Sequence, residues 1–231
     1  MWRLADACAA CAAATDSTAV VPDTLLSSPQ PTDVRPVTAR RTQPSPDERL
    51  RVREMLTYLA SALPRVTSPA ARLLALQCAL RTDANGVVRL PVGLLRGMRL
   101  HRRTELWEEL AHGFWLQPYE LRSGPVVVHL LDVAVWDQGP GRGPRRRAAH
   151  WALRPRPLLL HSAAPAAVQL IALALAAHLS PRATHTIGMD VLGHLCGHSL
   201  HQTAELLDRL VAIRTLASWR CGPDIAEVTW N

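Results

Sequence analysis

Four arginines lie close together near the middle of the chain: Arg96, Arg99, Arg102 and Arg103. The guanidinium group is a planar fork of N–H donors that can hold a phosphate or a guanine edge with two hydrogen bonds. All 26 basic residues are arginine, and the formal net charge is +7. Residues 47–115 carry eleven arginines and seven acids, whereas residues 158–231 carry four and five. The pattern suggests a polyanion partner, and simple solubility is the alternative that the charge pattern leaves open.

A second basic run extends from Gly139 to Arg147 and contains four arginines and no acid. Because glycine and proline interrupt regular structure, the run is predicted to be flexible, either at the tip of a hairpin or between domains. Such a segment can follow phosphates or enter a minor groove, and a solvated linker is the equal alternative. The candidate contact residues are Arg145, Arg146 and Arg147.

The last third of the chain is predicted to be an apolar helix, a helix-turn-helix and a hairpin. Gly197 can adopt the positive φ of a tight turn, and Ser199 is a good N-cap for a helix over residues 200–216. Strands are predicted over residues 218–221 and 225–230. Apolar side chains at three- and four-residue steps form the buried stripe of the helix: Leu206, Leu207, Leu210 and Ile213, with Thr203.

The same order of elements is predicted earlier in the chain. Leu110 and Leu210 occupy similar places in the two copies, and Gly113 is expected to end the earlier third helix as a C-cap residue. The earlier elements are an apolar helix over 69–80, a strand over 86–90, a short helix over 91–97, a third helix over 102–112 and a hairpin over 114–122 and 126–132.

This order resembles the winged helix-turn-helix fold of bacterial DNA-binding proteins, in two tandem copies. The resemblance implies a mainly α fold with short β-hairpins, divided into a disordered segment (1–46), an N-terminal helix with the first winged-helix domain (47–135), a basic linker (136–157) and a second winged-helix domain (158–231). It also implies base and phosphate contacts near the third helix of each copy. Besides the four arginines, the candidates are His101, Ser199, His201, Gln202 and Arg209.

The resemblance implies that this chain is a transcriptional regulator from a high-GC, actinobacterial-type bacterium. Its expected activity is sequence-specific binding of double-stranded DNA. A plasmid-type replication initiator with paired winged helices is one alternative. A tandem winged-helix adaptor that binds proteins is another, favoured by the even charge of residues 158–231. A homodimer is possible, and the expected location is the cytoplasm and nucleoid.

Other chemistry is not predicted. The sequence has no phosphate-binding loop, nucleophile elbow or zinc-protease motif, so an enzyme and a cofactor are not expected. His194, Cys196, His198 and His201 suggest zinc, but the turn at Gly197 divides them, and surface histidines with buried thiols are the preferred interpretation. The odd number of cysteines fits a reduced compartment, and no apolar run is long enough to span a membrane.

Overall fold

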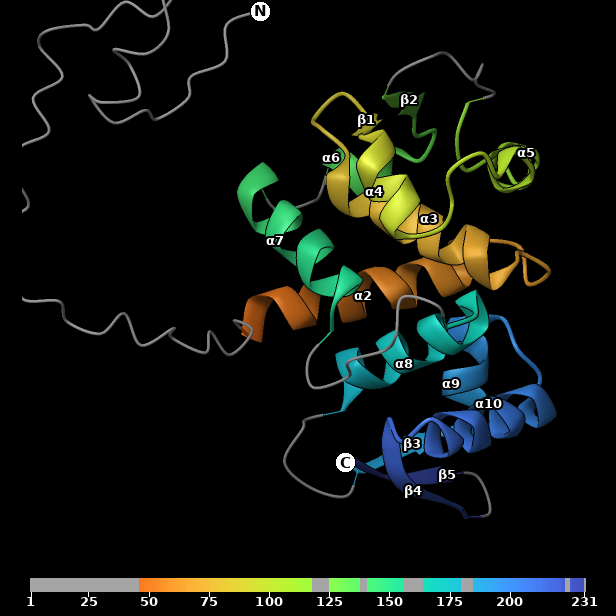
Figure 1. Ribbon diagram of the computed structural model, residues 1–231. Coiled ribbons are helices and arrows are strands. Elements are labelled where there is room, and N and C mark those ends of the chain that lie inside the picture. Colours follow the sequence, from red (N-terminus) through yellow and green to blue (C-terminus); the bar gives the residue numbers. More distant parts are fainter. Residues whose placement is uncertain are drawn as a thin grey trace, which may run out of the picture. The chain divides into compact units, whose positions relative to one another are not determined.

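The first element of the fold is helix α2 (Pro46–Ala62), which lies at the centre of the molecule (Figure 1). Asp47 and Glu48 occupy its first turn, where negative charge favours a helix N-terminus. Val52, Leu56 and Leu59 are buried at three- and four-residue steps, so one face of α2 enters the core. The computed structural model describes residues 46–117, 125–137, 141–155, 164–179, 185–222 and 225–230.

The first module, α3 to β2, follows α2 directly. Ser68 caps α3, since its hydroxyl oxygen accepts from Ala71 N at 3.3 Å, and proline at the next position suits a first turn. Every α3 residue from Ala70 to Leu80 is buried, so this helix is a core element rather than a surface one. The elements are α3 (Pro69–Arg81), β1 (Val87–Leu90), α4 (Val92–Gly97), α5 (Thr104–His112) and β2 (Val126–His129).

The strands of this module form a small antiparallel sheet. β1 pairs with β2, with Val87 opposite His129 and Leu90 opposite Val126. The chain that leaves α5 adds a further bridge between Leu116 and Leu130. The expected hairpin after α5 is therefore present where it can be followed, and residues 118–124 of it lie outside the described residues.

The second module, α8 to β5, repeats the order of the first. Its strands form a three-stranded antiparallel sheet in the order β3-β5-β4, with Trp219 opposite Val228 and Ile187 opposite Ala226. The elements are α8 (Ala166–His178), β3 (His185–Gly188), α9 (Met189–Cys196), α10 (Leu200–Ala212), β4 (Leu216–Cys221) and β5 (Ile225–Trp230). The predicted mainly α class with short antiparallel strands is confirmed.

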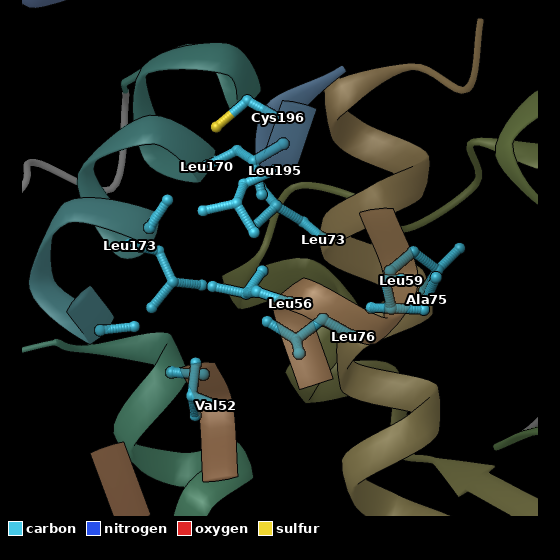
Figure 2. Close-up of a cluster of buried hydrophobic side chains, with 14 of the residues drawn as sticks. Val52, Leu56, Leu59, Leu73, Ala75, Leu76, Leu170, Leu173, Leu195 and Cys196 are labelled. Atoms are coloured by element: carbon cyan, nitrogen blue, oxygen red, sulfur yellow. The ribbon is translucent and has the colours of Figure 1, made fainter. Parts of the chain in front are cut away.

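Both modules share one hydrophobic core. α2 contacts α3, α8 and α9, and α3 contacts α8. Figure 2 shows buried side chains from all four helices meeting, including Leu56 of α2, Leu76 of α3, Leu173 of α8 and Leu195 of α9. Residues 43–231 are accordingly one compact unit rather than two domains on a flexible connection.

The prediction of a flexible basic linker over 136–157 is wrong for most of that segment. After the short helix α6 (Val133–Asp137), residues Arg142–Leu153 form helix α7, which packs on α2 and α3. Pro144 falls in the first turn of α7, where a missing N–H costs nothing because those groups have no intrahelical acceptor. A buried alanine stripe, Ala148, Ala149 and Ala152, then holds α7 against its neighbours.

The C-terminal ends of the two third helices differ from the prediction, one in its position and the other in its conformation. The helix expected over 200–216 ends at Ala212, because Arg214 adopts a left-handed φ of 56° and Leu216 begins β4. Gly113 is the C-cap of α5 as predicted, but its own φ is −77°. The left-handed conformation falls instead on Phe114, at φ 55°.

Candidate nucleic-acid interface

The four clustered arginines lie in and around the turn between α4 and α5, here named the arginine loop (residues 96–103). The loop is tightly folded, because the Leu95 carbonyl accepts hydrogen bonds from Leu100 N at 2.8 Å and from His101 N at 3.1 Å. The Leu100 side chain is 4% exposed and anchors the loop to the core. The backbone is therefore fixed from within while its polar side chains face outward.

All four arginines of the loop are exposed, and His101 is half-buried. Arg99 and Arg102 have φ values of 58° and 66°, a left-handed conformation that is unusual for a residue with a Cβ atom. Such strain is concentrated at functional sites. The loop therefore presents several closely spaced positive charges on a backbone that internal hydrogen bonds keep in place.

Carboxylates on α5 reduce this positive surface. Arg103 Nε lies 2.6 Å from Glu105 Oε1, so the two side chains form a surface ion pair. This hydrogen bond from Arg103 lowers the pKa of the Glu105 carboxyl. Glu108 is also exposed on α5. Arg96, Arg99 and Arg102 are consequently the stronger anion-binding candidates, because the carboxylate of Glu105 competes for Arg103.

The arginines of α7 do not extend the arginine loop. Figure 1 shows α7 and α5 on opposite sides of α3 and α4. Arg146 and Arg147 are exposed, and Arg147 Nε pairs with Glu48 Oε1 at 3.2 Å. Contacts from α7 and from the arginine loop would therefore fall on different parts of the surface.

Arg145 cannot serve as the predicted flexible phosphate contact, because its side chain is only 6% exposed. It precedes Ala148 and Ala149 by three and four residues, which places it on the buried face of α7. Burial lowers the pKa of its guanidinium, and the nearby Asp83 carboxylate acts in the opposite direction. The sequence signal of a Gly/Pro/Arg run concealed this helical periodicity.

In the second module, the predicted N-cap at Ser199 is confirmed as half of a capping box. Ser199 Oγ accepts from Gln202 N at 3.3 Å, and Gln202 Oε1 accepts from Ser199 N at 3.0 Å. The side-chain carbonyl of Gln202 thus caps α10. Bidentate recognition of adenine uses both the amide oxygen and the amide nitrogen of a glutamine. Gln202 would therefore have to break its hydrogen bond to Ser199 N to recognise adenine in this way.

The exposed face of α10 is mixed in charge. His201 Nε2 lies 3.2 Å from Glu205 Oε1, and Asp208 Oδ1 accepts from the Trp219 indole N–H at 2.7 Å. Arg209 is exposed beside these acids. This face offers a nucleic acid much less positive charge than the arginine loop does.

The zinc hypothesis gains no support from the described part of the chain, where no group of three or more His, Cys, Asp or Glu side chains could hold a metal ion. Cys196 is buried, and burial raises its thiol pKa to about 12. Burial lowers the pKa of His198, and the nearby charge of Arg72 lowers it further. The motif Cys8 to Cys11 lies outside the described residues.

One functional candidate was missed by sequence reasoning. Arg72 is 2% exposed within α3, a helix that is buried from Ala70 to Leu80. A single arginine between Ala71 and Leu73 in such a helix is the signal that could have revealed it, because a buried charge requires specific partners.

Comparison with known proteins found no matching family model, no matching curated protein and no matching solved structure. None of the described helices is long and apolar enough to cross a membrane. The site is therefore interpreted from its own geometry and charge.

Proposed function

We propose that the two modules are winged helix-turn-helix units. Each runs helix, strand, helix, helix, and each ends in a strand that pairs antiparallel with its first strand, β2 with β1 and β5 with β3. In the second module the first strand, β3, lies beside the last, β5, and the turn between β4 and β5 takes the place of the wing. α5 and α10 are then the third helices, the elements that in this fold commonly lie in a major groove.

The protein binds double-stranded DNA, in this proposal, through the arginine loop. The observation that carries it is the exposure of Arg96, Arg99, Arg102 and Arg103 around the turn that leads into α5. Each arginine that neutralises a phosphate releases condensed counterions, and one that reaches a guanine edge adds base discrimination. The anchored backbone of the loop reduces the ordering cost of these contacts.

The role that fits this binding best is transcriptional regulation. A plasmid-type replication initiator would use the same surface, and the DNA that is recognised separates the two. Binding at a promoter supports a regulator, whereas binding at iterated copies of one sequence supports an initiator.

A protein-interaction adaptor is the second candidate, and a specific observation favours it. The α10 face carries Glu205 and Asp208, and α5 carries Glu105 and Glu108. Carboxylates on both third helices disfavour close approach to phosphate. In this alternative the arginine loop would bind an acidic protein surface.

The deciding experiment is selection of bound duplexes from a genomic fragment library by the full chain at low salt. Enrichment of a common sequence supports the proposal. The R96A/R99A/R102A variant should lose that enrichment, and R146A/R147A is the matched control on α7, where enrichment should persist. If the intact chain enriches no sequence, the DNA-binding proposal is wrong and the adaptor is preferred.

A further inference from the structure

The junction between the two modules is built around Arg72 of α3. Its Nε donates to the Thr67 carbonyl at 3.1 Å, and its NH2 nitrogen donates to the Pro64 carbonyl at 2.9 Å. Both acceptors belong to the chain between α2 and α3. Burial lowers the pKa of Arg72, so maintaining this charge in the core depends on these carbonyl contacts.

The same guanidinium also contacts the second module. A Cβ atom added at Gly197 would lie 2.7 Å from Arg72 Nε and 2.9 Å from its NH2 nitrogen, so the backbone of the α9–α10 turn packs directly on it. Gly197 has a φ of 72°, which also favours glycine there. The residues on either side of Gly197 also experience the charge of Arg72: it lowers the pKa of His198 and moderates the rise in that of the Cys196 thiol.

Arg72 is also linked to α5, the helix that follows the arginine loop. Arg72 N donates to the Ser68 carbonyl at 2.9 Å, and the Ser68 hydroxyl donates to Glu109 Oε2 at 2.7 Å. Ser68 N donates to the other carboxylate oxygen of Glu109. A continuous path of hydrogen bonds and packing thus connects α5, through the N-terminal turn of α3, to the turn between α9 and α10.

Helix α8 makes the equivalent local hydrogen bond with a glutamine in place of the arginine. Gln169 occupies in α8 the place of Arg72 in α3, and its main-chain N donates to the Pro165 carbonyl at 3.0 Å. Its side-chain Nε2 donates to the Ala164 carbonyl, five residues earlier, at 2.7 Å. Arg72 Nε makes the equivalent bond five residues back to Thr67. Only the arginine guanidinium, through Nε and NH2, also packs against the backbone of the other module at Gly197.

We propose that Arg72 is a positioning residue that holds the α9–α10 helix-turn-helix at one fixed place relative to the arginine loop. The inference rests on the proposed function and specifies its ligand. That ligand is a DNA duplex with two contact regions, one for each module, separated by a fixed number of base pairs. Because Arg72 holds the α9–α10 turn against the N-terminal turn of α3, the helix-turn-helix of the second module keeps one position relative to the arginine loop. Recognition of both parts then requires that the DNA present them in one register.

The contact of Arg72 with the α9–α10 turn, here named the lock, is tested by hydrogen exchange on the full chain without DNA. We expect R72M, which keeps the length but removes the fork, to raise exchange of the amides of residues 193–198 by about tenfold or more. Q169M is the matched control, since it removes the equivalent local bond outside the junction. G197A is the second variant, to be used if R72M does not fold. It should raise the exchange rate of the same amides. Exchange within about twofold of the intact chain in the folded variant would overturn the lock.

The DNA part is tested with a site recovered by selection. Hydroxyl-radical footprinting should show two protected regions, and inserting about 5 bp between them, half a helical turn, should weaken binding by about tenfold or more. The same insertion should reduce the DNA affinity of R72M by less than about threefold, and Q169M should respond to it as the intact chain does. A single protected region, or equal loss in R72M and the intact chain, overturns the inference. If no DNA is bound at all, the proposed function fails, while the exchange measurement still reports on the lock.

Discussion

Leu110 and Leu210 hold equivalent places at the C-terminal ends of α5 and α10. The Leu110 carbonyl accepts from Trp115 N at 2.9 Å, and the Leu210 carbonyl accepts from Thr215 N, also at 2.9 Å. The residue before each donor, Phe114 or Arg214, has a left-handed φ of 55° or 56°. The two modules therefore leave their third helices by the same turn, although the side chains at the turn are different. This agreement in backbone conformation is stronger support for an internal repeat than the order of elements alone.

Replacing either leucine by alanine should destabilise the whole of residues 43–231. Both side chains are 0% exposed, so L110A and L210A each create a cavity that costs roughly 2–5 kcal/mol of the free energy of unfolding. Since the modules share one core, we expect a single cooperative transition in the intact chain and a lower midpoint in both variants. Urea denaturation followed by tryptophan fluorescence and circular dichroism measures this.

L200A is the control, because Leu200 lies on α10 but is 59% exposed. It should change the free energy of unfolding by less than about 0.5 kcal/mol. If L210A instead produced a separate early transition while the first module stayed folded, the two modules would be independent and the shared-core interpretation would be wrong.

The parts of the fold that could be predicted are those whose signals are local. An apolar run beginning at Pro69 identified α3, and the pairing of Gly197 with Ser199 identified the turn and cap before α10. The strands β1, β4 and β5 were found because short β-branched and aromatic runs lie next to turn residues. The arginine loop was found because its residues are adjacent in sequence.

The parts that could not be predicted depend on contacts far apart in the sequence. Helix α7 was missed because glycine and proline in its first turn resemble a linker, whereas Ala148 and Ala149 stabilise it only by packing on α2 and α3. The burial of Arg145 follows from that packing. The position of Arg72 against Gly197 joins residues of different modules, and no spacing rule in one sequence reports such a contact.

Glycine at position 114 should stabilise the protein relative to alanine. Phe114 is 83% exposed, so removing its ring loses little burial, and its φ of 55° penalises any residue with a Cβ atom. We expect F114G to be more stable than F114A by about 0.5–1 kcal/mol, measured by urea denaturation. Equal stability, or greater stability of F114A, would show that the left-handed turn is not retained without the aromatic ring.

Stability should fall as the pH falls below about 6.5, in part through His198. Burial lowers the pKa of His198 and the charge of Arg72 adds to this, so the unfolded chain takes up the proton more readily than the folded one. The loss begins near the unfolded pKa and continues until the folded pKa is passed. H198N should therefore make the fall in unfolding free energy between about pH 7.5 and pH 5.5 shallower.

Burial lowers the pKa of His178 as well, so H178N/H198N should flatten the pH dependence further than H198N alone. The measurement is urea denaturation at a series of pH values with ionic strength held constant. An H198N variant with the full pH dependence of the intact chain would mean that the imidazole is solvated rather than packed at the Arg72 junction.

The arginine loop should determine the salt dependence of DNA binding. For each phosphate contact that is lost, the slope of log K against log salt concentration becomes shallower by about 0.9. We expect R96A/R99A/R102A to reduce the slope by up to about 3, because all three side chains are exposed around one anchored turn. Fluorescence anisotropy titrations of a selected duplex between about 50 and 200 mM salt measure the slope.

R146A/R147A provides the control, since it removes two exposed arginines from α7, against the three that the loop variant removes. It should change the slope by less than about 1, because α7 lies across α3 and α4 from α5 and Arg147 is already paired with Glu48. If the α7 variant flattened the slope as much as the loop variant, DNA would follow α7 and the arginine loop would not be the principal surface. If neither variant changed the slope, the contacts would come from exposed arginines elsewhere, such as Arg89 on β1 or Arg209 on α10.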